Sequence, residues 1–502
     1  MRRNLTILAG LVAIVGLVTA SLAAIGESTA IVAEMPATAV ASADTPAPEP
    51  ATEEERVQRA REHDAMLDRE YPLHGLVTKT QIVVRMRPEP EAAPAGWLRV
   101  GSHVRLKRDR QTTSTCASGW YELWPRGWAC TGQGIEVSES APETDREITP
   151  DTTSALPYHY YFVKEPQVPE FHQLPSRDGQ REAAAHAARY LEFLRADDER
   201  RALRLRAGEL PNEPGPPREV GRWLDHGFFV ASNGVEVRSR RRFVRTVRGS
   251  YVKESQLEER TGPQFHGVEL GEERTLPVAW MVRAGRPMVR RDRDDGTTRM
   301  VDEEGVDALE RLSVVEGWQR RERVGDRFYH VLPGADGEPR YLRDWFVAVA
   351  EPREPPPRIA ADEPWVHVDL SAQTLVVYRG TTPIYATLVS SGVAEHATPI
   401  GEFTIRRKMV TDTMADLGPE ASDDRYRIED VPWTQYFEGS IALHAAFWHG
   451  QFGIQRSHGC VNLAPRDAQF VFGHTWPEIP EGWHGVSTEG TGVRGSRVLV
   501  TE

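Results

Sequence analysis

The sequence predicts a mainly β protein, with a C-terminal β domain preceded by small β modules and one amphipathic helix. The 36 prolines and 41 glycines favour turns and short strands over long helical bundles. Apolar and β-branched residues also gather in strand-length runs, of which 81–84 and 374–378 are clear examples. At 502 residues the chain is long enough for several domains.

The charge balance excludes one class of partner. The chain has 61 basic and 74 acidic residues, for a formal net charge of −13. A field of this sign repels polyanions over most of the surface. We therefore expect no nucleic-acid partner.

The N-terminus has the pattern of an export signal. Arg2 and Arg3 precede an uncharged, mostly apolar stretch that ends near small residues, as in a secretory signal peptide. The stretch is also long enough to cross a bilayer, so residues 1–26 are either a cleaved signal peptide or a membrane anchor. In both cases we expect the remaining chain in the periplasm or cell envelope. Contact with a membrane is expected only through this segment, if it stays uncleaved.

Two proline-containing segments are predicted to be linkers. Residues 27–56 are rich in Ala, Pro, Thr and Glu, a composition that buries too little apolar surface to fold. Residues 351–357 read Glu-Pro-Arg-Glu-Pro-Pro-Pro, which permits neither a helix nor a central strand. The second linker predicts the boundary before a last domain at 364–500.

Residues 76–138 alternate short β runs with turns and tryptophans, which predicts a small barrel that resembles a bacterial SH3-like module. Cys116 and Cys130 lie within it and predict a disulfide in an oxidising compartment. An aromatic-led strand, a turn and a second aromatic strand recur at 243–252 and 328–342. Residues 150–350 are therefore expected to hold one or two further SH3-like modules. These modules either bind the cell wall or are β spacers whose aromatic side chains form the core.

One amphipathic helix is expected between the first two modules, from Gly179 to about Leu205. Ala183, Ala187, Tyr190, Leu191 and Leu194 share helical spacing in this stretch. Ser176 and Asp178 are candidate caps at its start. The proline-rich residues 211–217 end it.

The domain at 364–500 is predicted to be mostly β. Residues 365–370 and 374–378 form a predicted hairpin, 384–390 a third strand and 497–500 a closing strand. The segment 409–427 has no strong pattern, and we expect it to be flexible. His367, His396, His474 and His484 are expected to be surface or structural residues.

Reactive side chains concentrate in this domain. His444, His449, His458 and Cys460 fall within 17 residues. An imidazole near a thiol lowers the thiol pKa below about 8.5 and favours the nucleophilic thiolate. Gly459 leaves room for a carbonyl and for backbone N–H groups that face a developing oxyanion. These groups suit acyl transfer through a thioester.

A zinc site is the alternative interpretation of the same four side chains. Three histidines and one cysteine are suitable ligand types for a tetrahedral ion. Zinc would, however, occupy the thiolate that acyl transfer requires. We therefore expect no metal and no other cofactor.

The motif Ser457-His458-Gly459-Cys460-Val461-Asn462-Leu463, with His444 sixteen residues before the cysteine, resembles the signature of the YkuD family of L,D-transpeptidases. The segment 398–403, Thr-Pro-Ile-Gly-Glu-Phe, is similar to an upstream element of the same family. Residues 430–433 and 448–449 resemble a subset of its members. The resemblance implies that residues 364–500 form an L,D-transpeptidase-like catalytic domain.

The resemblance implies roles for individual residues. Cys460 would be the nucleophile, His444 its general base, and the amides of Gly459 and Cys460 the oxyanion hole. The implied substrate-binding residues are Ser457, His458, Asn462, Trp448 and His449. Many members carry arginine where this chain has Asn462. Because residue 445 is alanine, a backbone carbonyl is expected to orient His444.

The family's activity implies a cysteine acyltransferase that acts on peptidoglycan stem peptides. The thiol would attack the carbonyl of the third residue of a tetrapeptide stem and release the terminal D-alanine. An amine would then resolve the acyl-enzyme, which gives a 3→3 cross-link or attaches a surface protein. Resolution by water instead gives an L,D-carboxypeptidase. The alternative from another class is a non-catalytic wall-binding protein.

Overall fold

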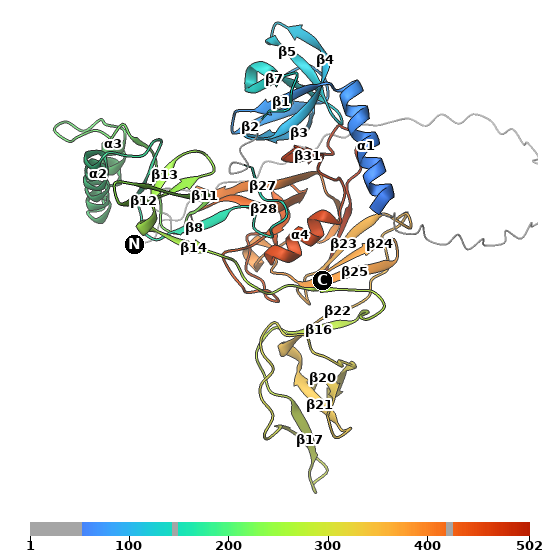
Figure 1. Cartoon of the computed structure of the whole chain (residues 1–502). Coiled ribbons are helices and arrows are strands. Elements are labelled where there is room, and N and C mark those ends of the chain that lie inside the picture. The colour runs from blue at the N-terminus through green and yellow to red at the C-terminus, as the bar shows by residue number, and fades with distance from the viewer. Residues whose placement is uncertain (1–52, 143–148, 418–424) are drawn as a thin grey trace, which may run out of the picture. The chain divides into compact units, whose positions relative to one another are not determined.

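A computed structural model of the protein describes residues 53–142, 149–417 and 425–502. Strands make up 42% and helices 15% of these described residues, so the prediction of a mainly β protein is confirmed (Figure 1). The expected signal peptide or anchor, and all but the last residues of the first linker, lie outside the described residues. Among the residues that are described, no helix has both the length and the apolar character needed to cross a membrane.

Helix α1 spans Glu53–Glu70 and begins inside the expected linker. Its sequence is rich in Glu, Arg, Ala, Met and Leu, which are good helix formers. The linker therefore ends before residue 53 rather than at residue 56.

The first β module follows helix α1. Its strands are β1 (Leu73–Val77), β2 (Gln81–Arg85), β3 (Pro94–Arg99), β4 (His103–Thr113), β5 (Cys116–Leu123), β6 (Trp128–Cys130) and β7 (Ile135–Ser138). Strand β1 pairs with both β4 and β7, and β4 continues into an antiparallel β4–β5–β6 meander. Val84, Leu98 and Leu106 are among its fully buried core side chains. Cys116 and Cys130 form a disulfide that joins β5 to β6, with the two Cα atoms 6.0 Å apart.

The helical region contains two helices instead of the single one expected. Helix α2 spans Arg177–Arg195 and helix α3 spans Glu199–Arg206. Ser176 caps α2 as predicted, because its side chain accepts a hydrogen bond from the Gly179 amide at 2.8 Å. The break occurs where Asp197 adopts a left-handed φ of 57° and Asp198 caps α3. Periodicity alone did not show this break, since apolar spacing continues across it.

The second β module is formed by strands that precede and follow this helix pair along the chain. Its strands are β8 (His159–Val163), β9 (Val168–Phe171), β10 (Val220–Leu224), β11 (Phe229–Arg238), β12 (Arg241–Thr246), β13 (Tyr251–Lys253) and β14 (Leu257–Arg260). Strand β11 pairs with β8 and β12, and β9 pairs with β10 and β13. We call residues 158–260 the second module.

The third β region lies between residues 278 and 350. Its strands are β16 (Val278–Met281), β17 (Met288–Asp292), β18 (Thr298–Asp302), β19 (Arg320–Val324), β20 (Arg327–Pro333), β21 (Pro339–Arg343) and β22 (Val347–Ala350). One local order recurs in all three regions: strand, 3₁₀ turn, strand, as in β6–η1–β7, β13–η2–β14 and β21–η3–β22. The turns are η1 (Thr131–Gln133), η2 (Glu254–Gln256) and η3 (Asp344–Phe346).

The C-terminal domain begins with the predicted hairpin. Its elements are β23 (Pro364–Asp369), β24 (Thr374–Arg379), β25 (Thr382–Leu388), η4 (Ala394–His396), β26 (Gly401–Thr404), β27 (Arg407–Asp416), β28 (Tyr426–Glu438), β29 (Ile441–Ala445), β30 (Val461–Leu463), α4 (Pro465–Gly473), β31 (Gly485–Ser487) and β32 (Arg497–Thr501). The β23–β24 hairpin, the third strand β25 and the closing strand β32 confirm the predicted strands. The expectation of a flexible 409–427 is wrong for residues 409–416 and 426–427, which lie in the paired strands β27 and β28.

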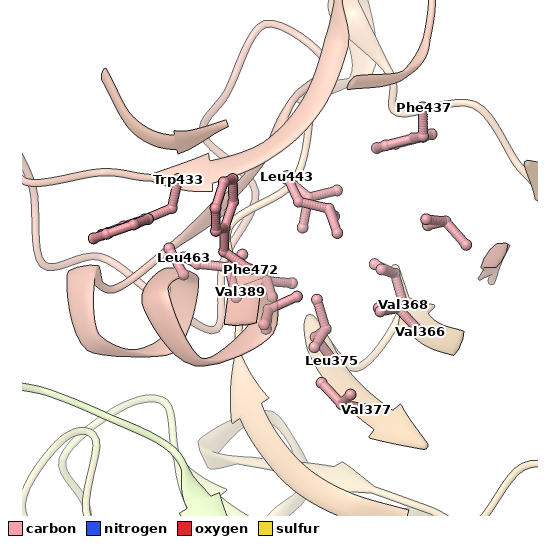
Figure 2. Close-up of a cluster of buried hydrophobic side chains, with 14 of the residues drawn as sticks. Val366, Val368, Leu375, Val377, Val389, Trp433, Phe437, Leu443, Leu463 and Phe472 are labelled. Atoms are coloured by element: carbon pink, nitrogen blue, oxygen red, sulfur yellow. The ribbon is translucent and has the colours of Figure 1, made fainter. Parts of the chain in front are cut away.

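The domain core lies between two sheets. Strands β23 and β24 belong to one sheet, whereas β28, β29 and β30 belong to the other. Figure 2 shows their apolar side chains together with Phe472 of α4, and the cluster includes Val366, Leu375, Leu443 and Leu463. Each of these four aliphatic side chains is fully buried, so the core fixes the strands that carry the reactive segment.

Upstream segments add strands to the C-terminal domain. Strand β3 pairs with β31 at Trp97↔Gly485, and β15 (Val268–Glu269) pairs with β25. At Gly96 a Cβ atom would lie 2.3 Å from the Gly485 carbonyl oxygen, so this close approach requires glycine. Trp483 of the C-terminal domain packs into the core of the first module. The first module and the β15 segment are therefore packed against the catalytic fold.

Candidate active site

Strand β29 places His444 at the site. Leu443 and Ala445 point into the domain core, and strand alternation turns His444 to the opposite face. Strand β30 runs parallel to β29 with His444 opposite Asn462. The chain preceding β30, including Cys460, is thereby brought next to the beginning of β29, just before His444.

The tautomer of His444 follows from its hydrogen bond. Its Nδ1 lies 3.0 Å from the carbonyl oxygen of Ala445. A carbonyl can only accept, so Nδ1 carries the proton and Nε2 is the free basic nitrogen. The expected backbone carbonyl is thus present. Burial lowers the pKa of His444 to about 4, although the bond to Ala445 acts in the opposite direction.

The segment around Cys460 is held by backbone pairing with residues 390–393. The Asn462 amide donates to the Ser390 carbonyl oxygen at 2.9 Å, and the Ser457 amide donates to that of Ser391 at 2.9 Å. The Thr398 hydroxyl donates to the Gly459 carbonyl oxygen at 2.8 Å. Thr398 is the first residue of the 398–403 element, so that element supports the turn next to the thiol.

Cys460 is the free thiol among the described cysteines and is half-buried. Its Sγ lies 3.8 Å from the carbonyl oxygen of Ser440, toward which it can donate. Burial raises the pKa of the Cys460 thiol, although a hydrogen bond with the Ala442 backbone opposes this effect. The expectation that an imidazole lowers this pKa is therefore wrong for the resting protein, because His444 is neutral and supplies no positive charge.

The amides near the sulfur differ from the expected pair. The Gly459 amide donates to Ser457 Oγ at 3.1 Å, and the Ser457 hydroxyl donates to the Cys460 carbonyl oxygen. Gly459 has φ of 111°, which only glycine adopts readily. Its N–H is therefore engaged within the turn, and its expected place in an oxyanion hole is not supported in this conformation.

His449 and Asn462 form a polar pair. The Gln451 amide donates to His449 Nδ1 at 3.1 Å, which leaves the proton on Nε2. Nε2 lies 3.0 Å from the Asn462 amide group, so the Asn462 carbonyl oxygen must face it. Both ring nitrogens are thus engaged, which leaves neither free as a zinc ligand. The described residues also show no group of three potential metal-ligating side chains.

A cavity of about 830 Å³ contains these groups. The sequence-predicted residues that line it are His444, Trp448, His449, Ser457, His458, Cys460 and Asn462. Sequence reasoning missed the other lining residues, which include Gly227, Phe229, His396 and Tyr426. His396, expected to be a surface or structural residue, is exposed, and its ring lies 4.9 Å from that of His458 on the cavity wall.

The raised thiol pKa predicts how Cys460 reacts with iodoacetamide. Because thiolate is the reactive form, the alkylation rate should rise about tenfold per pH unit from pH 6 to above pH 8. At pH 7 the alkylation rate of the folded protein should be lower than that of the denatured, unreduced chain, whose Cys460 has an ordinary pKa. The disulfide protects the other two cysteines, so the rate reports Cys460 alone. A rate that is flat between pH 5 and 8 would instead indicate a preformed thiolate–imidazolium pair.

A thiol and a neutral imidazole with a free basic nitrogen, both lining one cavity, define a candidate acyl-transfer site of the cysteine type. Residues 363–491 match the YkuD family, described as an L,D-transpeptidase catalytic domain. The chain therefore contains a YkuD-family L,D-transpeptidase catalytic domain, which confirms the resemblance at 364–500. The upstream modules lie outside this match, and their SH3-like character stays a prediction. No curated protein matches the chain.

Solved L,D-transpeptidase structures are similar to part of the chain. A mutant of the Enterococcus faecium enzyme has 21% identity over 28% of this chain and 50% of its own, with a TM-score of 0.22. The Mycobacterium smegmatis enzyme has 20% identity over 35% and 77%, with a TM-score of 0.24. A Stackebrandtia nassauensis enzyme has 25% identity over 29% and 58%, with a TM-score of 0.20. The chain thus spans half the length of the Enterococcus faecium structure.

Proposed function

We propose that the protein is an exported peptidoglycan L,D-transpeptidase that works through a thioester on Cys460. The observation that carries this proposal is that Cys460 and His444 line the same cavity in a YkuD catalytic domain. The substrate is the tetrapeptide stem of peptidoglycan, in the periplasm or cell envelope. The cavity volume of about 830 Å³ is in the range that holds ligands of short-peptide size.

His444 acts as a general base in the first half-reaction. The Cys460 thiol is protonated at rest, so its proton must move as the sulfur attacks. Nε2 of His444 accepts that proton while the sulfur bonds to the carbonyl carbon of the third stem residue. The tetrahedral intermediate then expels D-alanine, whose amine takes the proton back from Nε2. A thioester and neutral His444 remain.

An acceptor amine completes the reaction. The amine attacks the thioester carbon and gives one proton to His444, and the thiolate leaves and recovers that proton. The product is an amide, which is a 3→3 cross-link when the amine belongs to another stem. An amine on a surface protein would give an attached protein by the same chemistry. The identity of the acceptor depends on which amine can enter the cavity.

Backbone and side-chain groups of the cavity support these steps. The Cys460 amide is the proposed donor to the oxyanion, since the Gly459 amide is engaged by Ser457. The His449–Asn462 pair and Trp448 line the cavity and would contact the donor stem. His458 lies beside Tyr426, at a ring separation of 5.7 Å, and forms another part of the wall.

Intact-mass spectrometry of residues 53–502 with a disaccharide-tetrapeptide tests this function. We expect an adduct whose mass is that of the substrate without its terminal D-alanine, and complete loss of the adduct in Cys460→Ala. Adding a second stem peptide as acceptor should release the adduct as a cross-linked dimer. Release as free tripeptide alone would indicate an L,D-carboxypeptidase. Absence of any adduct in the folded wild type would contradict acyl transfer from this donor.

A further inference from the structure

The ring of His444 is covered by one aromatic side chain. The Trp448 indole stacks on the imidazole at a centroid distance of 5.7 Å and an angle of 27°. His444 is almost fully buried, at 2% exposure, whereas Trp448 is only partly buried. The orientation of the basic nitrogen therefore depends on the packing of Trp448 as well as on the hydrogen bond to the Ala445 carbonyl.

An aromatic side chain of the second module lies against Trp448. Phe229, the first residue of β11, lies 6.3 Å from Trp448 and 5.5 Å from Phe447. Tyr160 of β8 stacks on Phe447 at 4.0 Å, and Phe447 meets Trp448 edge to face at 5.1 Å. A continuous group of aromatic rings thus runs from β8 and β11 to the imidazole. Edge-to-face and offset contacts of this kind fix ring orientation as well as burying area.

Charged contacts keep the second module against β28. Arg222 forms a salt bridge with Glu429, and Arg248 lies 3.5 Å from the same carboxylate. Glu429 is fully buried, and Arg427 of β28 also lies 3.2 Å from its carboxylate. Separating the second module from β28 would therefore remove two of the three arginine partners that the described residues give this buried charge. Next to it, Phe229 pairs with Ile428 across the two strands. These contacts hold Phe229 at a defined position relative to the site.

Phe229 also borders the reactive groups directly. Both Gly227 and Phe229 line the cavity that contains Cys460 and His444. Neither residue belongs to the matched catalytic domain at 363–491. A wall of the cavity is therefore supplied by a segment more than 200 residues upstream of Cys460.

We propose that Phe229 is a positioning residue, which presses Trp448 onto the His444 ring and makes the second module a working part of the active site. The module then has a role that neither a wall-binding module nor a plain spacer would have. The reaction affected is the proposed acyl transfer, so the kinetic part of this inference rests on the proposed function. The expected effect on the properties of His444 and Cys460 themselves does not rest on the proposed function.

Loss of the Phe229 ring should have two physical consequences. Trp448 would gain rotational freedom, and the imidazole would lose its fixed orientation toward the sulfur. Water would also reach His444, and its pKa, now lowered by burial to about 4, would rise toward the ordinary value. Small losses of alignment in an active site can cost up to about 10²-fold in rate.

The test compares Phe229→Leu with Phe243→Leu in residues 53–502. Phe243 is a fully buried phenylalanine of β12 in the same module and lines no part of the cavity, so it is a matched control for lost packing. For Phe229→Leu we expect kcat with disaccharide-tetrapeptide to fall about 10- to 100-fold while KM changes much less. Phe229→Tyr should retain most of the wild-type rate, because tyrosine keeps the aromatic ring. Phe243→Leu should retain most of the wild-type kcat.

A second measurement keeps the inference independent of the substrate. Histidine NMR titration should show a higher pKa for His444 in Phe229→Leu than in Phe243→Leu, whether or not the peptide is turned over. Equal titration curves in the two variants would overturn the positioning role. If the wild type formed no peptide adduct but His444 still responded to Phe229→Leu alone, the proposed function would fail and this inference would stand.

Discussion

Replacing His444 by glutamine should lower the rate of Cys460 acylation by about 10²- to 10⁴-fold at pH 7. The reason is that burial raises the pKa of the thiol, so little thiolate exists at this pH without a base to remove the proton. Glutamine keeps a polar side chain of similar reach but has no basic nitrogen. The measurement is the single-turnover rate of adduct formation with disaccharide-tetrapeptide.

The pH dependence separates a lost base from a damaged fold. In the wild type His444 accepts a proton only when neutral, and its pKa lies near 4. The acylation rate should therefore stay nearly constant from pH 8 down to about pH 5 and fall about tenfold per pH unit below pH 4. In His444→Gln the rate should instead rise about tenfold per unit up to the raised thiol pKa, because hydroxide must make the thiolate. A merely misfolded variant would not recover with pH.

His474→Gln is the matched control. His474 ends helix α4, where its Nδ1 lies 2.8 Å from the Phe470 carbonyl oxygen, and it does not line the cavity. We expect its acylation rate to stay within a few-fold of the wild type. A similar loss in both histidine variants would show that His444 acts through stability rather than as the base.

The reactive segment was predictable because its chemistry is local in sequence. Cys460 and His444 are sixteen residues apart, and the strand pattern of 441–445 is enough to turn His444 away from the core. Because Ala445 has no side chain that could orient His444, a backbone carbonyl was the expected hydrogen-bond partner, and His444 has such a partner. The thiol pKa was not predictable, because it depends on burial, and burial depends on the whole domain.

Contributions from distant segments could not be predicted. Phe229 reads as an ordinary core aromatic of a β strand, and nothing in its sequence neighbourhood indicates that β11 meets β28. His396 carries no spacing signal and reaches the cavity only because the turn after β25 returns to the motif through Ser390. Helix α3 begins at Glu199, after the left-handed Asp197 and the cap Asp198, and hydrophobic periodicity alone does not reveal this break.

Replacing Asp430 by asparagine should lower the free energy of unfolding by about 3–5 kcal/mol. Asp430 is 2% exposed and forms a salt bridge with Arg99 of the first module, whose side chain is also buried. Its backbone carbonyl oxygen accepts a hydrogen bond from the Tyr160 hydroxyl of the second module at 2.7 Å. The Arg99 charge would be left without its counter-ion, and that cost exceeds the loss of one ordinary hydrogen bond.

The pH dependence has a definite sign. Burial alone would raise the pKa of Asp430, but the Arg99 charge outweighs it, so the pKa lies below the ordinary value of 3.8. A carboxyl with a lowered pKa stabilises the fold above its ordinary value and loses that contribution as the pH falls through the folded value. The wild type and Asp430→Asn should therefore differ most above about pH 5 and converge in acid. Thermal unfolding by calorimetry at pH 7 and at pH 3 measures this.

Asparagine is the informative replacement because of the backbone. Asp430 has φ of 52°, a left-handed conformation that asparagine tolerates and most residues do not. The change therefore removes the charge without adding backbone strain. The control is Glu316→Gln, whose exposed pair with Arg274 at 3.0 Å should be worth less than about 1 kcal/mol.

The double variant Arg99→Gln with Asp430→Asn isolates the unpaired charge. If the penalty of Asp430→Asn comes from the stranded guanidinium, removing that group as well should recover a large part of the lost stability, since two neutral amides can hydrogen-bond to each other. If the double variant is as unstable as the sum of the two single changes, the cost arises from packing around Thr411 and Tyr160 instead. The same comparison shows whether the junction of the first module, the second module and β28 depends on charge, because all three meet at Asp430.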